Sequence, residues 1–409
     1  MSLNSKKERK HFRIKELMNK TVENCCHRFS GGMNALGYVN LLIKPASSLC
    51  NMRCIYCFYA DESEHRMQKS MGIMTEETSR KLIDAAFTAA GKRGSISFSF
   101  QGGEPTMAGL GFFRDFTAMV QERNLEGLQV NWAIQTNGLN LDENWAKLLR
   151  KHHFLVGVSV DGDRALHDRF RPDAAGMGTW ERVTGKVRML LEQQVDTNIL
   201  CVVNGRTAQS PKKVYRALKE LGTGYLQFIP CLDPLEMPRG AMDWSLTPGA
   251  YGRFLCGVFD DWYKDWARGQ YVSVRQFDDW VHLAMGLPPG TCASSGQCGG
   301  YLIVEADGSL YPCDFYALDE WKLGTVEDEL KNLMASEKML AFQRRSFGKP
   351  AKCKGCRYFR LCRGGCPRDW TELDGKTENY YCPAFQMFFD YAGERILQIA
   401  AREIQAMQH

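Results

Sequence analysis

The stretch CNMRCIYC, residues 50–57, decides how this chain folds and what it holds. It follows an apolar run, residues 39–43, which predicts a short buried strand with Cys50, Cys54 and Cys57 on the loop beyond it. An iron–sulfur cube takes one thiolate per iron, so three thiolates leave one iron with a position that a small molecule can fill. Structural zinc favours separated pairs of ligands in a closed shell, which this spacing does not supply.

Length and charge narrow the class of protein. With 409 residues and 44% apolar content, the chain is long enough for one large domain and a smaller one. Its 52 basic and 47 acidic residues nearly balance, which gives no support to nucleic acid or an anionic membrane as a partner. Because it has no apolar run of membrane-spanning length and no secretory signal core, we expect a cytoplasmic protein without a membrane partner.

The 16 cysteines are the outlier in the composition. In a reducing compartment their expected use is metal ligation rather than disulfide formation. Three lie in the first stretch, eight lie between Cys292 and Cys382, and five are scattered. Among the scattered ones, Cys201 and Cys231 lie in or beside apolar runs, so we expect them to be small buried hydrophobic residues.

Strand-like runs alternate with helix-length segments from residue 39 onward. Strands are predicted at 39–43, 95–101, 129–135, 155–160, 197–203 and 225–229, and helices near 75–90, 109–123, 141–152, 178–194 and 209–221. A helix between consecutive strands predicts parallel βα units, because parallel neighbours need crossover connections. Six units are too few for a closed eightfold barrel, so the expected fold class is α/β, an open partial (β/α)6 barrel.

Polar motifs follow several predicted strands, at the edge where α/β folds collect their functional groups. In GGEP, residues 102–105, two glycines let the backbone approach a ligand and place an acceptor or a backbone carbonyl near an ammonium group. The short polar side chains of QTNG, residues 135–138, and SVDG, residues 159–162, suit hydrogen bonds to a ribose and a carboxylate. Arg171 has the charge to neutralise a carboxylate; the alternative is an ordinary surface arginine.

The cysteines from Cys292 onward indicate two further metal sites. Cys292 and Cys298 precede YLIVEADGSLYPCD, residues 301–314, where Asp-Gly between apolar runs predicts a β-hairpin that brings Cys313 back towards Cys298. The remaining thiols are those of Cys353, Cys356, Cys362, Cys366 and Cys382. Eight thiolates make two complete four-ligand sets, and this count suits iron–sulfur clusters and tetrahedral zinc alike.

Taken together, the motifs resemble the radical S-adenosylmethionine (SAM) superfamily with a SPASM extension. The superfamily motif has the spacing of residues 50–57, with an aromatic residue, here Tyr56, before the third cysteine. Over about residues 38–395, the sequence resembles the anaerobic sulfatase-maturating enzymes. The segments that carry this resemblance are LLIKPASS, CFYADE, FQGGEPTMAG, LQFIPCLDPL, EADGSLYPCDFYALDEWKLG and CRGGC. The domains then expected are a basic arm (1–36), a radical SAM barrel (37–235), a helical connection (236–290), a SPASM domain (291–385) and a C-terminal helix (386–409).

The resemblance also implies which residues bind cofactors. Matching positions for SAM contacts are Tyr56, Gly103, Glu104, Ser159, Arg171 and Leu232, with Gly103 and Glu104 at its methionine amine. Three [4Fe-4S] clusters are implied, one on Cys50, Cys54 and Cys57, one on Cys292, Cys298, Cys313 and Cys366, and one on Cys353, Cys356, Cys362 and Cys382. Because Cys366 belongs to the first auxiliary set in this scheme, one chain segment ties the two auxiliary clusters together.

The implied reaction is the oxidation of a cysteine or serine in a sulfatase Cys/Ser-x-Pro-x-Arg segment to the aldehyde formylglycine (3-oxoalanine). SAM supplies a radical that removes a β-hydrogen, after which an electron and a proton must leave. Asp314 is the candidate proton acceptor because it directly follows the ligand Cys313, which anchors its backbone; a helix cap or an ion-pair partner are the alternatives. The expected partners are an unfolded or nascent sulfatase polypeptide and an electron donor such as a flavodoxin or a ferredoxin.

Three other functions fit parts of the pattern. One is a SPASM enzyme that forms thioether or carbon links in a ribosomal peptide, which a tested substrate would distinguish. The others are a non-enzymatic iron–sulfur electron carrier and a zinc-stapled binding module. An electron carrier needs neither the GGEP turn nor an open three-cysteine site, and a zinc protein would be colourless when isolated anaerobically.

Overall fold

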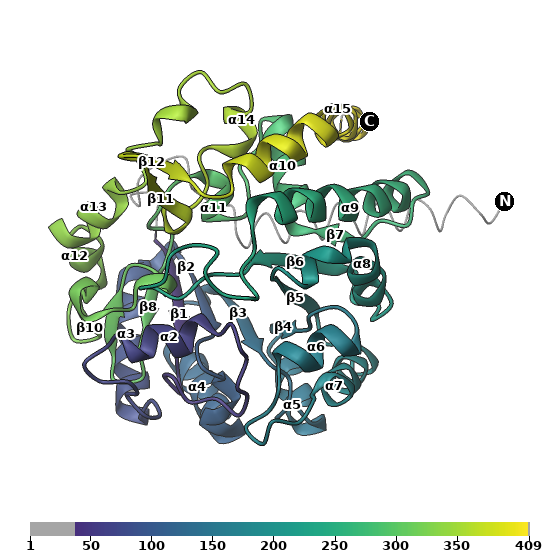
Figure 1. Cartoon of the computed structure of the whole chain (residues 1–409). Coiled ribbons are helices and arrows are strands. Elements are labelled where there is room, and N and C mark those ends of the chain that lie inside the picture. The colour runs from purple at the N-terminus through teal and green to yellow at the C-terminus, as the bar shows by residue number, and fades with distance from the viewer. Residues whose placement is uncertain (1–36, 408–409) are drawn as a thin grey trace.

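The computed structural model describes residues 37–407 (Figure 1), so the basic arm predicted at residues 1–36 lies outside the described residues. Ten strands of the described part form one sheet, in the order β10-β9-β8-β1-β2-β3-β4-β5-β6-β7. Their bounds are β1 (Tyr38–Ile43), β2 (Ser95–Phe100), β3 (Gln129–Thr136), β4 (Leu155–Ser159), β5 (Thr197–Val203), β6 (Tyr225–Pro230), β7 (Ser273–Val274), β8 (Leu302–Val304), β9 (Ser309–Tyr311) and β10 (Gly324–Thr325).

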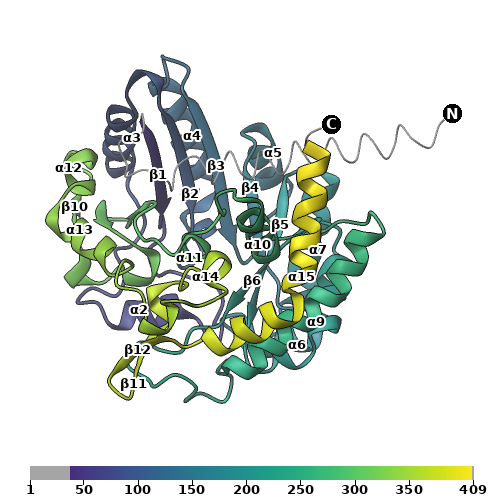
Figure 2. The same ribbon diagram turned by 90° about the horizontal axis from the view of Figure 1, so that it is seen from above.

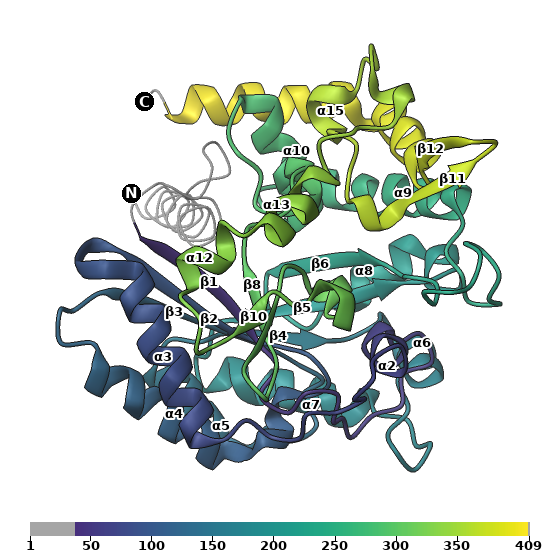
Figure 3. The ribbon, with the colours of Figure 1, turned by 90° about the vertical axis from the view of Figure 1, so that its left-hand side faces the viewer.

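Strands β1 to β7 are parallel to their neighbours, as crossover connections require. The crossovers contain α3 (Glu76–Ala90), α4 (Gly109–Arg123), α5 (Glu143–Lys151), α6 (Arg164–Phe170), α7 (Trp180–Glu192) and α8 (Pro211–Lys219). Figure 3 shows α3, α4 and α5 on one side of the sheet. The predicted α/β fold with a partial (β/α)6 barrel is therefore confirmed.

The helices begin and end where the sequence provides capping groups. At α5 the Asp142 side chain accepts hydrogen bonds from the backbone N–H groups of Asn144 and Trp145, both at 2.9 Å, which satisfies two donors of the first turn. Leu148 and Leu149 lie on the buried face of the same helix. A capped helix with one apolar face packs onto the sheet and fixes the strand that follows it.

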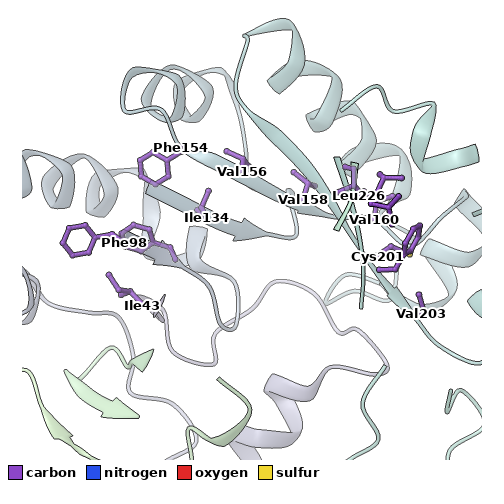
Figure 4. Packing of buried hydrophobic residues seen from close by; sticks show 14 of the residues in the cluster. Ile43, Phe98, Ile134, Phe154, Val156, Val158, Val160, Cys201, Val203 and Leu226 are labelled. Carbon is purple, nitrogen blue, oxygen red and sulfur yellow. The ribbon is translucent and has the colours of Figure 1, made fainter. Parts of the chain in front are cut away.

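The core lies between the sheet and these helices (Figure 4). Ile43, Phe98, Ile134 and Val158 come from four consecutive strands and are all buried. The ring of Phe98 stacks on that of Trp132, with 5.3 Å between their centroids. Burial of a side chain of this size contributes roughly 1.5–3 kcal/mol, so the strand ends that carry the site motifs are held by a rigid core.

The predicted hairpin is present, and it also extends the main sheet. Strands β8 and β9 are antiparallel with Asp307 and Gly308 at their turn, and Gly308 has a φ of 85° that favours glycine. Strand β8 pairs in parallel with β1, with Leu302 opposite Leu41. The sequence did not predict this pairing. It places the cysteine-rich segment directly beside the strand that leads into the first cysteine loop.

Figure 3 shows α10 and α15 across the sheet from α3, α4 and α5. The helices that follow the barrel strands in the chain are α9 (Pro248–Ala267), α10 (Arg275–Met285), α11 (Cys292–Ser295), α12 (Leu330–Met334), α13 (Glu337–Arg344), α14 (Phe359–Cys362) and α15 (Cys382–Met407). Figure 2 shows α15 alongside α9, and the Phe388 ring of α15 lies 4.6 Å from that of Trp280 in α10. The C-terminal helix thus begins four residues before the expected position 386, at the ligand candidate Cys382.

A second, separate hairpin joins β11 (Trp370–Leu373) to β12 (Lys376–Asn379).

None of the helices within residues 37–407 combines the length and the apolar character needed to cross a bilayer.

Candidate active site

The first cysteine loop, residues 50–57, runs from β1 to helix α2 (Phe58–Glu64) and is tied to the segment after α6. The backbone N–H of Arg53 donates to the carbonyl of Pro172 at 2.9 Å, and that of Ile55 donates to the carbonyl of Phe170 at 3.0 Å. These bonds hold the loop at two points between its cysteines. Its thiols therefore project from a fixed backbone.

The surroundings of the first thiols fit thiolate ligands. Burial raises the pKa of Cys50 to about 11 and that of Cys54 to about 12. Donors approach the sulfur atoms, with the N–H of Met52 and the Nδ2 of Asn137 at 3.4 Å and 3.8 Å from Cys50 Sγ. Arg171 Nη1 lies 3.9 Å from Cys54 Sγ. Donors of this kind stabilise a sulfur that is deprotonated by metal binding, so the residues present suit an iron–sulfur cluster.

The GGEP turn lies against the segment that leads into Cys50. A Cβ on Gly103 would lie 2.5 Å from the Leu49 carbonyl oxygen and 2.6 Å from that of Ser47. Gly103 has a φ of 46°, and the N–H of Glu104 donates to the Leu49 carbonyl at 2.8 Å. Only glycine fits this contact without strain, as expected for a turn that brings backbone close to a bound ligand.

The Glu104 carboxylate is already satisfied within the protein and is only 1% exposed. Its Oε1 accepts from the N–H and the hydroxyl of Thr106, at 3.0 Å and 2.6 Å, and from the Thr136 hydroxyl at 2.7 Å. Its Oε2 accepts from the backbone N–H of Asn137 at 2.7 Å. Glu104 therefore ties the end of β2 to the end of β3, which the sequence did not reveal. A contact of Gly103 and Glu104 with the SAM amine stays a prediction.

Arg171 and Tyr56 converge on Asp161, beyond the end of β4. Arg171 Nε donates to Asp161 Oδ2 at 2.9 Å, and the Tyr56 hydroxyl donates to the same oxygen. Arg171 is only 7% exposed, so the alternative of a surface arginine is wrong. The arrangement orients the guanidinium between Asp161 and the sulfur of Cys54, where its charge favours a thiolate.

The last two predicted SAM residues end β4 and follow β6. Ser159 accepts a hydrogen bond from Gln135 Nε2 at 3.0 Å, so the ends of β3 and β4 are joined. Leu232 is half-buried and follows Cys231, whose carbonyl accepts from the Tyr381 hydroxyl at 3.0 Å. Both residues keep their assignment as predictions.

The carboxylate of Asp314 meets three side chains from the loops after β1 and β2 and from α2. The Tyr59 hydroxyl donates to Asp314 Oδ2 at 2.5 Å, and Gln101 Nε2 lies 3.3 Å from the same oxygen. Lys44 Nζ lies 3.7 Å from Oδ1, which has no hydrogen-bond partner among the described residues. Burial raises the pKa of the Asp314 carboxyl, and Lys44 and Tyr59 oppose that effect. Oδ2 is thus held by hydrogen bonds, while Oδ1 has only the ion pair with Lys44 and keeps its lone pairs for a proton.

Lys44 joins Asp314 to a buried charge network that the sequence did not reveal. Lys44 Nζ lies 3.2 Å from Glu62 Oε2 and 3.7 Å from Glu305 Oε1, and Arg66 Nη1 donates to Glu305 Oε1 at 2.7 Å. Every member of this network is less than 9% exposed. The sequence signal was weak, because a lysine after an apolar strand is usually exposed. The ion-pair alternative for Asp314 is therefore correct in geometry, with Lys44 paired to Oδ1 at 3.7 Å, and the use of this oxygen as a base stays a prediction.

The pH dependence of stability should report on Glu62. Burial raises its pKa from 4.5 to about 7, with Asp314 adding to the shift and Lys44 and Arg66 opposing it. Because the folded state holds this proton more strongly, its stabilising effect is complete below about pH 4 and is lost as the pH rises through 7. In wild type, this effect should change the free energy of unfolding by up to about 3 kcal/mol across that pH range, and Glu62→Gln should remove the change.

Urea denaturation of anaerobically prepared protein between about pH 5 and pH 8 measures this effect. The matched control is Glu64→Gln, two residues along the same helix, where the side chain is 61% exposed. Parallel pH curves for wild type and Glu62→Gln would contradict the raised pKa.

The eight downstream cysteines gather into two groups. We call Cys292, Cys298, Cys313 and Cys366 the inner set and Cys353, Cys356, Cys362 and Cys382 the outer set. Within each set the thiolates raise one another's pKa. These are the groupings that the resemblance implied, brought together by the hairpin, by α14 and by the first residue of α15.

Within residues 37–407, no three side chains of the ligand type are close enough to hold a single metal ion. In a [4Fe-4S] cube each thiolate binds a different iron. Burial raises the pKa of Cys292 to about 11 and of Cys362 to about 12, so both sets offer shielded sulfur donors. The residues of both sets suit a cluster.

Two protein-family models match the chain: the radical SAM superfamily over residues 45–218 and the iron–sulfur cluster-binding SPASM domain over residues 292–357. The chain is 42% identical over 365 residues to the cysteine-type anaerobic sulfatase-maturating enzyme of Clostridium perfringens, which covers 88% of this chain and 98% of that enzyme. It is 32% identical over 352 residues to the serine-type enzyme of Klebsiella aerogenes, with 86% and 84% covered.

Solved structures agree with these matches. Native anSMEcpe with bound AdoMet and Cp18Cys peptide superposes with a TM-score of 0.84 at 41% identity, covering 89% of this chain and 99% of that one. Streptococcus suis SuiB bound to precursor peptide SuiA gives a TM-score of 0.55 at 15% identity, covering 87% and 76%. At that identity SuiB shares the fold alone.

Proposed function

The chain belongs to the anaerobic sulfatase-maturating enzymes, which are radical SAM enzymes with a SPASM domain, and from this premise we propose that it oxidises a cysteine or serine of a sulfatase to Cα-formylglycine. Family membership confirms the resemblance, the enzyme class and the cofactors SAM and several [4Fe-4S] clusters. The two non-enzymatic alternatives are therefore wrong. The observation that carries the proposal is the buried Asp314 carboxylate, whose Oδ2 is held by Tyr59 and Gln101 while its Oδ1 accepts no hydrogen bond among the described residues.

The residues of the barrel mouth hold the cofactors in this proposal. Cys50, Cys54 and Cys57 bind the first cluster, and the GGEP turn with the ends of β3, β4 and β6 binds SAM. When bound, these groups supply the radical that removes one hydrogen atom from the β carbon of the substrate residue. The glycine turn serves by letting backbone carbonyls approach the cofactor amine without a side chain between them.

Asp314 Oδ1 then takes the proton of the substrate thiol or hydroxyl. Tyr59 and Gln101 hold Oδ2, which fixes the direction of Oδ1, and Lys44 beside Oδ1 favours the ionised form that acts as a base. Loss of a hydrogen atom, a proton and an electron turns serine directly into the aldehyde. From cysteine it gives a thioaldehyde, which water converts to the aldehyde and hydrogen sulfide.

The inner and outer sets, whose cysteines share one chain segment, would hold the clusters, and these clusters would supply an acceptor for the electron. A flavodoxin or ferredoxin would supply the electron that starts each turnover. The substrate is an extended segment of an unfolded or nascent sulfatase, because a residue must enter the barrel mouth, and the reaction is proposed to take place in the cytoplasm.

The test is anaerobic reconstitution followed by incubation with SAM, a chemical reductant and a Cys-x-Pro-x-Arg peptide. Mass spectrometry and capture by a hydrazide reagent should detect the aldehyde. Matched peptides carry serine or alanine at the first position; greater identity with the cysteine-type relatives, 42% against 32%, favours the cysteine peptide. A thioether or carbon link without an aldehyde would instead support the ribosomal-peptide alternative.

Iron analysis should find about twelve irons per chain, because three cubes hold four each. Cys54→Ala should lower this to about eight and abolish SAM cleavage, since it removes a ligand of the first cluster only. Cys256→Ala is the matched control, because this thiol lies in α9 with Asp260 and Arg395 as its charged neighbours. Zinc in place of iron in anaerobically purified protein would contradict the prediction.

A further inference from the structure

Lys349 is the cationic side chain that lies between the two auxiliary cysteine sets. Its Nζ donates to the carbonyl of Gly296, in the loop between Cys292 and Cys298 of the inner set. Its aliphatic chain lies along the turn that joins the two sets, since a Cβ on Gly364 would be 3.1 Å from Lys349 Cδ. The same Cβ would be 3.6 Å from Cys353 Sγ of the outer set. One lysine therefore contacts backbone that belongs to both sites.

The position of Lys349 is fixed by further contacts. Its Nζ lies 5.6 Å from the centre of the Trp370 ring, a distance at which a cation is attracted to the ring face. The indole N–H of Trp370 donates to the Gly364 carbonyl at 2.8 Å, and Asn379 Nδ2 donates to the same oxygen at 3.0 Å. The turn, the ring and the ammonium thus hold one another, and the lysine has little freedom to turn towards solvent.

The electrostatics agree with this placement. Burial lowers the pKa of Lys349, while the thiolates of Cys298 and Cys366 from the inner set and of Cys353 and Cys362 from the outer set raise it. In return, Lys349 lowers the pKa of Cys298 and Cys353. No acidic side chain is within ion-pair distance of Lys349 among the described residues. The charge of Lys349 is therefore not neutralised by a carboxylate, and it acts on the two metal sites.

We propose that Lys349 is a positioning residue that sets the reduction potentials of the two auxiliary clusters and eases electron passage between them. A reduced cluster carries one more negative charge than an oxidised one, and a fixed ammonium beside it stabilises the reduced form. Because the Lys349 ammonium lies between the two sites, its charge raises the reduction potentials of both auxiliary clusters. This inference rests on the proposed function, because it gives the substrate electron a favourable acceptor.

The test is a redox titration of the reconstituted full chain, followed by electron paramagnetic resonance. It is repeated with Cys50, Cys54 and Cys57 replaced by alanine, so that only the auxiliary clusters contribute. Lys349→Met should make reduction about tenfold less favourable, a shift of about 59 mV to lower potential for one electron. Lys349→Arg should keep potentials near those of wild type, because it keeps the charge.

The matched control is Lys338→Met, whose Nζ likewise donates to a backbone carbonyl, that of Lys322, at 2.9 Å. It removes the same charge from the same part of the chain and should leave the potentials unchanged. If Lys349→Met loses iron, Lys349→Gln is used in place of the methionine variant. Glutamine keeps a hydrogen-bond donor for the Gly296 carbonyl but removes the charge. Potentials equal to wild type in the neutral variants would overturn the proposal. The titration requires no peptide substrate, so its result is independent of whether formylglycine is formed.

Discussion

Replacing Asp314 with asparagine is expected to lower formation of the aldehyde by about 10²–10⁴-fold, the range that a positioned general base contributes. Asparagine keeps the size of the side chain and can still pair with Tyr59 and Gln101, but it cannot accept the proton at Oδ1. Hydrogen removal from the substrate uses the radical and not the carboxylate. The ratio of deoxyadenosine to aldehyde should therefore rise, and chromatography of both products measures it.

The control for Asp314→Asn is Asp307→Asn in the hairpin turn. Asp307 is exposed and accepts hydrogen bonds from the N–H and the hydroxyl of Ser309, at 2.9 Å and 2.8 Å. Asn-Gly forms the same hairpin turn as Asp-Gly, so this variant should behave as wild type. If Asp314→Asn forms aldehyde with the wild-type ratio of products, the proton acceptor is another group.

Replacing Lys44 with methionine is expected to destabilise the protein by about 3–5 kcal/mol, the usual result of removing one partner from a buried charge cluster. Methionine fills a similar volume, so the loss reflects charge. Glu62, Glu305 and Asp314 would remain buried, with only Arg66 to offset them. The midpoint of urea denaturation measures the change, and the aldehyde assay should fall as well because Asp314 loses its counter-charge.

Lys81→Met is the matched control for Lys44→Met. Lys81 also pairs with two carboxylates, Glu77 at 2.9 Å and Glu327 at 2.8 Å, but its side chain is 42% exposed. Exposed pairs contribute roughly 0–1 kcal/mol, so its loss should be small. Adding Glu62→Gln to Lys44→Met should recover part of the stability, because it removes one of the unpaired charges. Equal losses for the two lysine variants would contradict the buried network.

The strands and crossover helices of the barrel could be predicted because buried parallel strands are continuous apolar runs. The pairing of β8 with β1 could not, since strands of three residues carry no information about their neighbour. Helix α15 begins at Cys382, four residues before the predicted start at 386, because the predicted boundary was placed after the last cysteine. The role of Lys349 could not be predicted because its neighbours Gly296, Gly364 and Trp370 come from separate segments of the chain.

The sequence by itself indicated the candidate ligand cysteines, the glycine turn and the chemistry they suit, because ligand spacing within a loop is a local property. Only the tertiary structure decided which charges are buried together. Lys44, Glu62, Glu305 and Asp314 come from four segments, and their ion pairs exist because β8 places the hairpin against β1. Burial excludes water from these charges, and this exclusion depends on packing across the sheet rather than on any residue's immediate neighbours in the chain.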